Sequence, residues 1–356
     1  MKSNHIILLT FLSLFLFVQS VYNQSNSSFL QEEITVYNKA ANITLSGTFS
    51  RPTAKGKYPT VLLIWGNGPH TRDMVISGSP VFKQLADSLN QAGYAVLRMD
   101  KRGFGKSTGP KGDSEGVTTT FDLLDDMQYS YHFLQSRNDV DTSKIGLFGH
   151  SEGATIAPML ASRESSVKFV MILCPPAVPG DSIFLAQRIH NMRELGMQET
   201  VIPKVYEEWK RLVAFIETDF SDDATYYQLG IDFLVAHGLE KEKATHAFVD
   251  QVIDAFRMPW YQQFFRIDPA EYLSQLKMPV LAIFGTNDTE VTTEQNLLPM
   301  TRALTGNPHN QITVLNEHDH FFILHKGQML KKHKFGEMEF SSATWQTMKN
   351  WLDRVL

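Results

Sequence analysis

The sequence Gly149-His150-Ser151-Glu152-Gly153 stands between a strand pattern and a helix pattern. The apolar run from Ile145 to Phe148 comes directly before it, and a helical pattern from Ala154 to Ser162 comes directly after it. A G-x-S-x-G sequence between a strand and a helix forms a strained turn, which lifts the serine hydroxyl clear and leaves almost no room for side chains at the flanking glycines. The pattern therefore predicts that Ser151 is a nucleophile at the end of a strand.

The alternation of strand and helix extends on both sides of this turn. Continuous apolar runs of strand length occupy residues 60–65, 95–99, 145–148, 169–173, 279–284 and 311–315. Helical patterns separate them at residues 82–91 and 121–134, and an amphipathic pattern closes the sequence at 341–356. Strands that are apolar on both faces and alternate with helices form a parallel sheet covered by helices on both faces. We therefore expect an α/β protein with a mostly parallel central sheet.

This alternation stops at residues 177–276, which are mainly helical in pattern and rich in methionine, aromatic and charged residues. A helical insertion between two strands of one sheet predicts a lid over the carboxyl edge, where open α/β sheets bind ligands. The remaining residues, 33–176 and 277–356, are the expected core. The core begins with two alternating segments, 33–37 and 43–49, which predict an antiparallel hairpin.

The N-terminal residues 1–20 have the features of a secretory signal peptide. Lys2 is followed by an apolar run at residues 6–18 and then by small and polar residues. The run is shorter than the roughly 20 residues that cross a bilayer, which disfavours an uncleaved anchor. We therefore predict a disordered Ser- and Asn-rich leader at residues 21–32, no integral membrane span in the mature chain, and a secreted or periplasmic location.

The composition limits the class of partner. The 33 basic and 38 acidic residues are interspersed and give a net charge of −5, so no basic face indicates nucleic acid as a partner. The single cysteine, Cys174, cannot form an internal disulfide and is expected to be a small core residue. A small neutral or modestly polar ligand fits this composition better.

A serine nucleophile needs a histidine to remove its proton and a carboxylate to orient that histidine. The apolar strand at residues 279–284 turns through glycine to Asp288, which is where the carboxylate is expected. Glu290 is the nearest alternative. Both residues follow Ser151 in the sequence and precede the candidate histidines.

Two histidines, His318 and His320, follow the strand at residues 311–315. We favour His320 as the base because the two aromatic residues after it can pack against it, while His318 remains an alternative. Two adjacent candidate ligands without a third usually belong to a polar loop, so we expect no metal and no other cofactor.

The tetrahedral intermediate of acyl transfer needs backbone N–H donors aimed at its oxyanion. One is expected from Glu152, which follows the nucleophile, and the other from the glycine-containing loop at residues 66–73. Asn67 is the first choice in this loop and Gly68 the second. The charged residues of this loop and of residues 100–102 are expected to pair with one another and fix the backbone.

Aromatic side chains occur at near-helical spacing between residues 260 and 265 of the predicted lid. Such spacing usually reflects packing. Because the segment lies in the lid, we select Trp260 and Phe264 as candidates for lining a pocket for the acyl or alcohol group.

Four segments together resemble the α/β-hydrolase superfamily: residues 66–73, 99–109, 149–153 and 259–269. Within it, the chain is most similar to serine carboxylesterases related to dienelactone hydrolases and to prolyl-oligopeptidase-type catalytic domains. The resemblance extends from about residue 33 to the end and is weak in the lid. It implies that Ser151, Asp288 and His320 form a catalytic triad. It also implies that Asn67 and Glu152 are the oxyanion donors.

These features predict a serine hydrolase that cleaves small-molecule carboxylic esters through an acyl-enzyme intermediate. A thioesterase or a serine peptidase or amidase with the same triad is the nearest alternative, although the sequence lacks the long repeat region expected of an oligopeptidase. A non-catalytic binding protein with this fold is the alternative from another class, because a fold alone does not establish function.

Overall fold

The computed structural model describes residues 29–110, 117–218, 222–325 and 338–356. The predicted signal peptide and residues 21–28 of the predicted leader lie outside the described residues. The described part contains an 8-stranded sheet. Its strands are β1 (Phe29–Asn38), β2 (Ile43–Pro52), β3 (Tyr58–Ile64), β6 (Ala95–Met99), β7 (Val140–His150), β8 (Phe169–Leu173), β9 (Val280–Gly285) and β10 (Gln311–Leu315).

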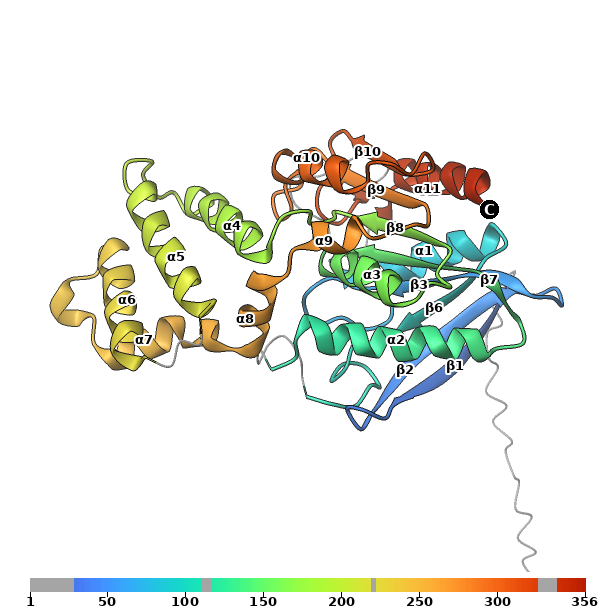
Figure 1. Ribbon diagram of the computed structural model, residues 1–356, viewed down its shortest axis with the longest axis horizontal. Coiled ribbons are helices and arrows are strands. Elements are labelled where there is room, and N and C mark those ends of the chain that lie inside the picture. Colours follow the sequence, from blue (N-terminus) through green and yellow to red (C-terminus); the bar gives the residue numbers. More distant parts are fainter. Residues whose placement is uncertain (1–28, 111–116, 219–221, 326–337) are drawn as a thin grey trace, which may run out of the picture.

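The strand order is β1-β2-β6-β3-β7-β8-β9-β10 (Figure 1). The pairs β1/β2 and β2/β6 are antiparallel, and each later pair in this order is parallel. All residues of β6, β8 and β9 are buried, as expected for strands that are apolar on both faces. The structure therefore confirms the predicted mostly parallel α/β sheet.

Helices cover both faces of the sheet. Helices α2 (Thr120–Ser136) and α3 (Glu152–Arg163) pack against each other, while α1 (Val81–Gln91) contacts β6 and α11 (Ser342–Val355) contacts β9 (Figure 1). One large hydrophobic cluster fills the space between the sheet and these helices. Helix α10 (Thr293–Ala303) follows β9. Short strand pairs that the sequence did not indicate are β4 (Val75–Ile76) with β5 (Ser79–Pro80) and β11 (Ile323–His325) with β12 (Met338–Phe340).

The first strand begins earlier than the sequence indicated. Residues 29–32, which were assigned to the disordered leader, belong to β1, where Phe29 is buried and pairs with Pro52. The four residues after Phe29 are exposed on this edge strand, so an alternating pattern starts only at Ile34. The early part of the strand is specified by pairing with β2, which the periodicity of its own residues does not reveal.

The part of the chain that connects β8 to β9 forms a group of helices, which lies beside the sheet (Figure 1). It contains α4 (Gly180–Glu194), α5 (Ile202–Ile216), α6 (Asp223–Ala236), α7 (His246–Ile253) and α8 (Pro259–Arg266), with short 3-10 turns η2 (Lys241–Lys243) and η3 (Asp254–Arg257). Its buried side chains form a second hydrophobic cluster that runs from Phe184 to Phe265.

Helix α9 (Pro269–Leu273) lies within the predicted lid segment, but Leu273 belongs to the core of the sheet. The separate core of the insertion therefore ends at α8. Within the residues that the structure describes, no helix combines the length and the apolar character required to cross a bilayer.

Candidate active site

Ser151 occupies a strained turn between β7 and α3. Its φ of 55° and ψ of −118° lie outside the regions that a residue with a side chain usually adopts, at a cost of about 1–3 kcal/mol. A Cβ added at Gly149 would lie 2.1 Å from the carbonyl oxygen of Gly153, and one added at Gly153 would lie 2.2 Å from that of Ile64. The two glycines are therefore sterically required, and the turn has the geometry of a nucleophile elbow.

Asp288 and His320 meet at the ends of two neighbouring strands. The Nδ1 atom of His320 lies 3.0 and 3.1 Å from the two carboxylate oxygens of Asp288, which follows β9. The backbone N–H groups of Glu290 and Val291 also donate to Asp288, each at 2.9 Å. Glu290 itself has an exposed side chain. The structure thus places Asp288 against the histidine.

Burial and the opposite charge of the partner have opposing effects on the pKa values of His320 and Asp288. Burial opposes the charge on His320, but the carboxylate of Asp288 raises the pKa of His320 above its ordinary value. Burial likewise opposes the charge on Asp288, but the contact with His320 and the two backbone donors lower the pKa of Asp288. With Nδ1–H held by the carboxylate, Nε2 of His320 is the nitrogen left to accept a proton.

His318 points to different partners. Its Nδ1 lies 2.7 Å from the carbonyl oxygen of Asn316, and its Nε2 lies 2.7 Å from the hydroxyl of Ser341. Ser341 also accepts a hydrogen bond from the backbone of Thr344 and so caps α11. Both ring nitrogens of His318 are therefore used to join its loop to α11.

His150 links the turn at Ser151 to the loop of His320. Its Nε2 lies 2.8 Å from the carbonyl oxygen of His320, and the two ring centres are 4.9 Å apart. Within the described part of the chain no hydrogen bond joins the Ser151 hydroxyl to His320, and such bonds are often long in unliganded enzymes. Burial, followed by the charge of His320, lowers the pKa of His150 to about 3, so this ring stays neutral.

A further cluster combines donor types that bind metals. Ligand atoms of His150, Cys174 and His320 lie within 4.8 Å of one another. The Cys174 thiol donates to the carbonyl of His320 at 2.8 Å, the same oxygen that His150 contacts. Burial raises the pKa of this thiol well above its ordinary value, whereas a metal ligand must be a thiolate. The chemistry of these groups fits a hydrogen-bonded cluster better than a metal site.

The two predicted oxyanion donors lie beside the nucleophile. Asn67 follows β3 and Glu152 is the first residue of α3, so neither N–H group belongs to the hydrogen bonds of a strand or a helix. A Cβ added at Gly66 would lie 3.0 Å from the Cβ of Ser151, so the Asn67 loop passes directly over the nucleophile. The N–H of Gly68 already donates to the Asn67 side chain at 2.7 Å. This favours Asn67 over Gly68.

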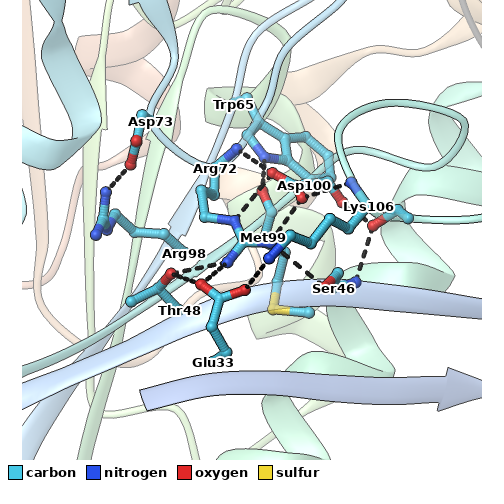
Figure 2. Close-up of polar contacts among 11 residues, drawn as sticks. Glu33, Ser46, Thr48, Trp65, Arg72, Asp73, Arg98, Met99, Asp100 and Lys106 are labelled. Atoms are coloured by element: carbon cyan, nitrogen blue, oxygen red, sulfur yellow. Dashed lines mark hydrogen bonds and ion pairs between the residues drawn. The ribbon is translucent and has the colours of Figure 1, made fainter. Parts of the chain in front are cut away.

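Charged residues hold this loop in place (Figure 2). Arg72 pairs with Asp100 at 2.8 Å and with Glu33 at 2.6 Å, and Asp100 also accepts from the backbone N–H of Arg72. Asp73 pairs with Arg98. Of the loop charges expected to pair with one another, Arg72 and Asp100 do so, whereas Asp73 pairs with Arg98 of β6.

A buried lysine, Lys101, joins the loop at residues 66–73 to the turn at Ser151. The Nζ atom of Lys101 lies 3.3 Å from the carbonyl oxygens of both Gly66 and Gly68. It also lies 3.8 Å from Oε2 of Glu152, and the side chains of the pair are 0% and 3% exposed. Lys101 therefore binds the backbone on both sides of Asn67 and the side chain of the second donor residue.

Glu152 also contacts the helical insertion. Its Oε1 accepts hydrogen bonds from Thr120 at 2.7 Å and from the indole N–H of Trp260 at 2.9 Å. The rings of Trp260 and Phe264 are stacked with centres 4.6 Å apart. The insertion is thus attached to the residue that follows the nucleophile.

A cavity of about 230 Å³ opens at Ser151 between the sheet and the insertion. It is lined by Asn67, Ser151, Glu152, Pro176, Ile183, Phe184, Gln187, Arg188, Trp260, Tyr261, Phe264 and Val291. Both aromatic residues selected from the sequence therefore line the cavity with the nucleophile. Tyr261, from the same aromatic segment, also lines it, whereas the sequence interpretation missed Phe184, Gln187 and Arg188. Helical spacing puts Phe184 and Arg188 on one face of α4, but nothing in the sequence says that this face meets the nucleophile.

The chain resembles known hydrolases over most of its length. Residues 75–322 match the family described as serine aminopeptidase, S33. Esterase EstD of Thermotoga maritima is 27% identical over 301 residues, which cover 85% of this chain and 62% of EstD. The chain therefore spans less than two thirds of the length of that relative.

Solved structures share the fold. The esterase Pf2001 of Pyrococcus furiosus superposes with a TM-score of 0.57 at 17% identity, covering 92% of this chain and 91% of the esterase. Est1E of Butyrivibrio proteoclasticus, solved with ferulic acid bound, superposes with a TM-score of 0.52 at 16% identity, covering 90% and 98% of the two chains. The family match extends over well more than half of this chain, and the chain therefore belongs to the serine aminopeptidase S33 family of the α/β-hydrolase superfamily.

Proposed function

We propose that this chain is a serine hydrolase that cleaves carboxylic esters through an acyl-enzyme intermediate. Ser151 attacks the ester carbonyl, and Nε2 of His320 accepts the hydroxyl proton and passes it to the leaving alcohol. Asp288 holds the other ring nitrogen and stabilises the imidazolium. Water, activated by the same histidine, then attacks the acyl-enzyme and releases the acid. The observation that carries this proposal is the strained Ser151 turn beside the Asp288–His320 pair.

The N–H groups of Asn67 and Glu152 stabilise the oxyanion in this proposal. Donors placed before the reaction begins lower the barrier because they need no reorganisation when charge develops. The contacts of Lys101 with the carbonyls of Gly66 and Gly68 support the loop that carries the first donor.

A serine aminopeptidase with the same catalytic residues is the second candidate, since the family description names that activity. An aminopeptidase must bind a protonated amino terminus, for which a free carboxylate is the usual partner. Glu152 is the acidic residue among the described residues that line the cavity; its Oε1 accepts from Thr120 and Trp260, and its Oε2 lies 3.8 Å from Nζ of Lys101. The esterase names of EstD and Pf2001 also favour an ester substrate.

The helical insertion is proposed to act as a lid that selects the substrate by size. Trp260 and Phe264 line the cavity and stack on each other, so truncation of either ring enlarges it. Replacing Phe264 by alanine should change the relative rates for esters of different acyl length more than it changes the rate for the best substrate.

The chain is also proposed to be exported. Lys2 and the apolar run at residues 6–18 support a signal peptide over residues 1–20 and a secreted or periplasmic enzyme. The N-terminal sequence of the exported protein tests this directly, since a mature chain that still begins at Met1 would contradict it.

The experiment that tests the activity compares acyl esters, thioesters and aminoacyl anilides as substrates. Ester hydrolysis should be fastest, and Ser151→Ala should lower kcat by a factor on the order of 10³ or more. Ser162→Ala is the matched control, because this serine lies on α3 and its hydroxyl only donates to the carbonyl of Met159. Faster hydrolysis of aminoacyl anilides would favour the aminopeptidase, and a folded Ser151→Ala protein with full activity would overturn the assignment of the nucleophile.

A further inference from the structure

Arg188 lies in the wall of the cavity at Ser151 without a polar partner. It extends from α4 and is the one lysine or arginine among the residues that line this cavity. Its Nε is buried and makes no hydrogen bond, and among the described residues no carboxylate lies within ion-pairing distance of its guanidinium. By contrast Arg193, on the same helix, pairs with Glu199 at 2.9 Å.

This isolation is costly for a half-buried cation. Burial lowers the pKa of Arg188, and the charge of Glu290 offsets this only in part. Arginine nevertheless remains charged in proteins, so the group cannot escape by losing its proton. A buried donor without an acceptor is destabilising, and such a group in a native structure calls for an explanation.

Two aromatic rings lie beside the guanidinium. Its central carbon lies 4.6 Å from the ring centre of Phe184 and 5.8 Å from that of Trp209. Stacking of this kind stabilises the charge but supplies no acceptor for the N–H groups, which lie at the edge of the guanidinium plane. These rings therefore leave the N–H groups of Arg188 without an acceptor, in a residue that lines the cavity.

The neighbouring side chains do not supply the missing anion. The carboxylate of Glu152 is bound by Thr120, Trp260 and Lys101, and the side chain of Glu290 is exposed. Tyr261 lines the same cavity, and burial raises the pKa of its phenol, which stays protonated and can donate a second hydrogen bond. Arg188 and Tyr261 therefore both present hydrogen-bond donors at this cavity.

We propose that Arg188 binds a carboxylate of the substrate, so that the preferred substrates are esters that carry a carboxylate away from the scissile bond. This inference rests on the proposed esterase function and names the class of ester. A planar guanidinium binds a carboxylate through two parallel hydrogen bonds, which gives orientation as well as affinity. The bound carboxylate fixes the far end of the substrate while Ser151 attacks the ester at the near end.

The kinetic test uses pairs of 4-nitrophenyl esters of equal length. One member of each pair is the mono-ester of succinic, glutaric or adipic acid, and the other has its free carboxylate capped as a methyl ester. For at least one length, the free acid should have a kcat/KM higher by roughly tenfold to a hundredfold, the range expected for hydrogen bonds to a charged group. In Arg188→Gln the ratio between the two members should fall to near 1. Arg193→Gln is the matched control and should keep the wild-type ratio.

A binding measurement separates this inference from the proposed function. Calorimetric titration of the Ser151→Ala protein with glutarate or adipate should show binding that Arg188→Gln removes in the same background. If capped esters are hydrolysed but no pair shows a preference and no dicarboxylate binds, the inference fails and the esterase proposal stands. If dicarboxylates bind through Arg188 but no ester is hydrolysed, the esterase proposal fails and the carboxylate site stands. If Arg188→Gln lowered kcat/KM equally for both members of each pair, Arg188 would be a packing residue and the inference would be overturned.

Discussion

Replacing Lys101 by methionine should destabilise the protein more than replacing Lys101 and Glu152 together. The ammonium and the carboxylate are 3.8 Å apart, and their side chains are 0% and 3% exposed. At this distance two unit charges interact by about 4 kcal/mol at an effective dielectric constant of about 20. Removing the lysine leaves a buried carboxylate with no cation beside it, which costs about 3–5 kcal/mol of unfolding free energy.

Glu152→Gln should be milder, at about 1–3 kcal/mol, because the lysine keeps the carbonyls of Gly66 and Gly68 as acceptors. The glutamine also keeps an oxygen for Thr120 and Trp260. The double variant Lys101→Met/Glu152→Gln contains no unpaired buried charge and should be more stable than Lys101→Met alone. Urea unfolding of the four proteins measures this as a double-mutant cycle. Additive losses in the cycle would refute the claim that the pair is coupled.

Three further predictions follow from the described contacts. His320→Ala should lower kcat by a factor on the order of 10³ or more, while His318→Ala should lose about tenfold or less, and the reverse ranking on folded proteins at saturating substrate would make His318 the base. The pKa of His150 is lowered from its ordinary value of 6.5 to about 3 in the folded state, so between these pH values the unfolded state binds more protons. The free energy of unfolding should therefore fall as the pH drops from 6.5 towards 3, by up to about 1.4 kcal/mol per pH unit. His150→Gln keeps a donor for the His320 carbonyl and should show a shallower pH dependence of unfolding free energy, whereas an unchanged slope would exclude His150 as its source. Cys174 is fully buried with a raised pKa, so a thiol reagent should modify it only after denaturation, and rapid labelling of the native protein would contradict this placement.

The turn at Ser151 could be predicted because its requirements are local. Glycines at positions 149 and 153 are needed where backbone atoms approach within 2.2 Å of a hypothetical Cβ, and the flanking strand and helix have their own periodicity. Asp288 was predictable for a related reason, since carboxyl ends of parallel strands share one edge of the sheet.

The choice between the two histidines depended on geometry that spacing does not encode. Residues two apart in an extended loop point in similar directions, which left both histidines as candidates. In the structure Glu317 and Phe322 have positive φ values of 61° and 54°, so the loop is not extended. Phe321 packs edge-on against His320, whereas Phe322 packs against His318. The expected aromatic support for His320 therefore comes from Phe321.

The partners of Lys101 and the position of Arg188 at the cavity could not be assigned from the sequence. Lys101 stands among charged loop residues and is fully buried only because the turn at Ser151 and the loop at residues 66–73 close around it. Arg188 belongs to a helix whose packing against α8 decides which face meets the cavity. Such roles arise from contacts between distant segments, which neither composition nor periodicity reveals.

Covalent labelling shows whether the hydroxyl of Ser151 is the activated nucleophile. A fluorophosphonate reacts with a serine only when a base and an oxyanion site activate that hydroxyl. Intact-mass and peptide mass spectrometry of the treated protein should show one adduct per chain on the peptide that contains Ser151. Labelling should be lost in Ser151→Ala, strongly slowed in His320→Ala and kept in Ser162→Ala. An adduct on another residue, or an unlabelled Ser151 in a protein that hydrolyses esters, would contradict the account.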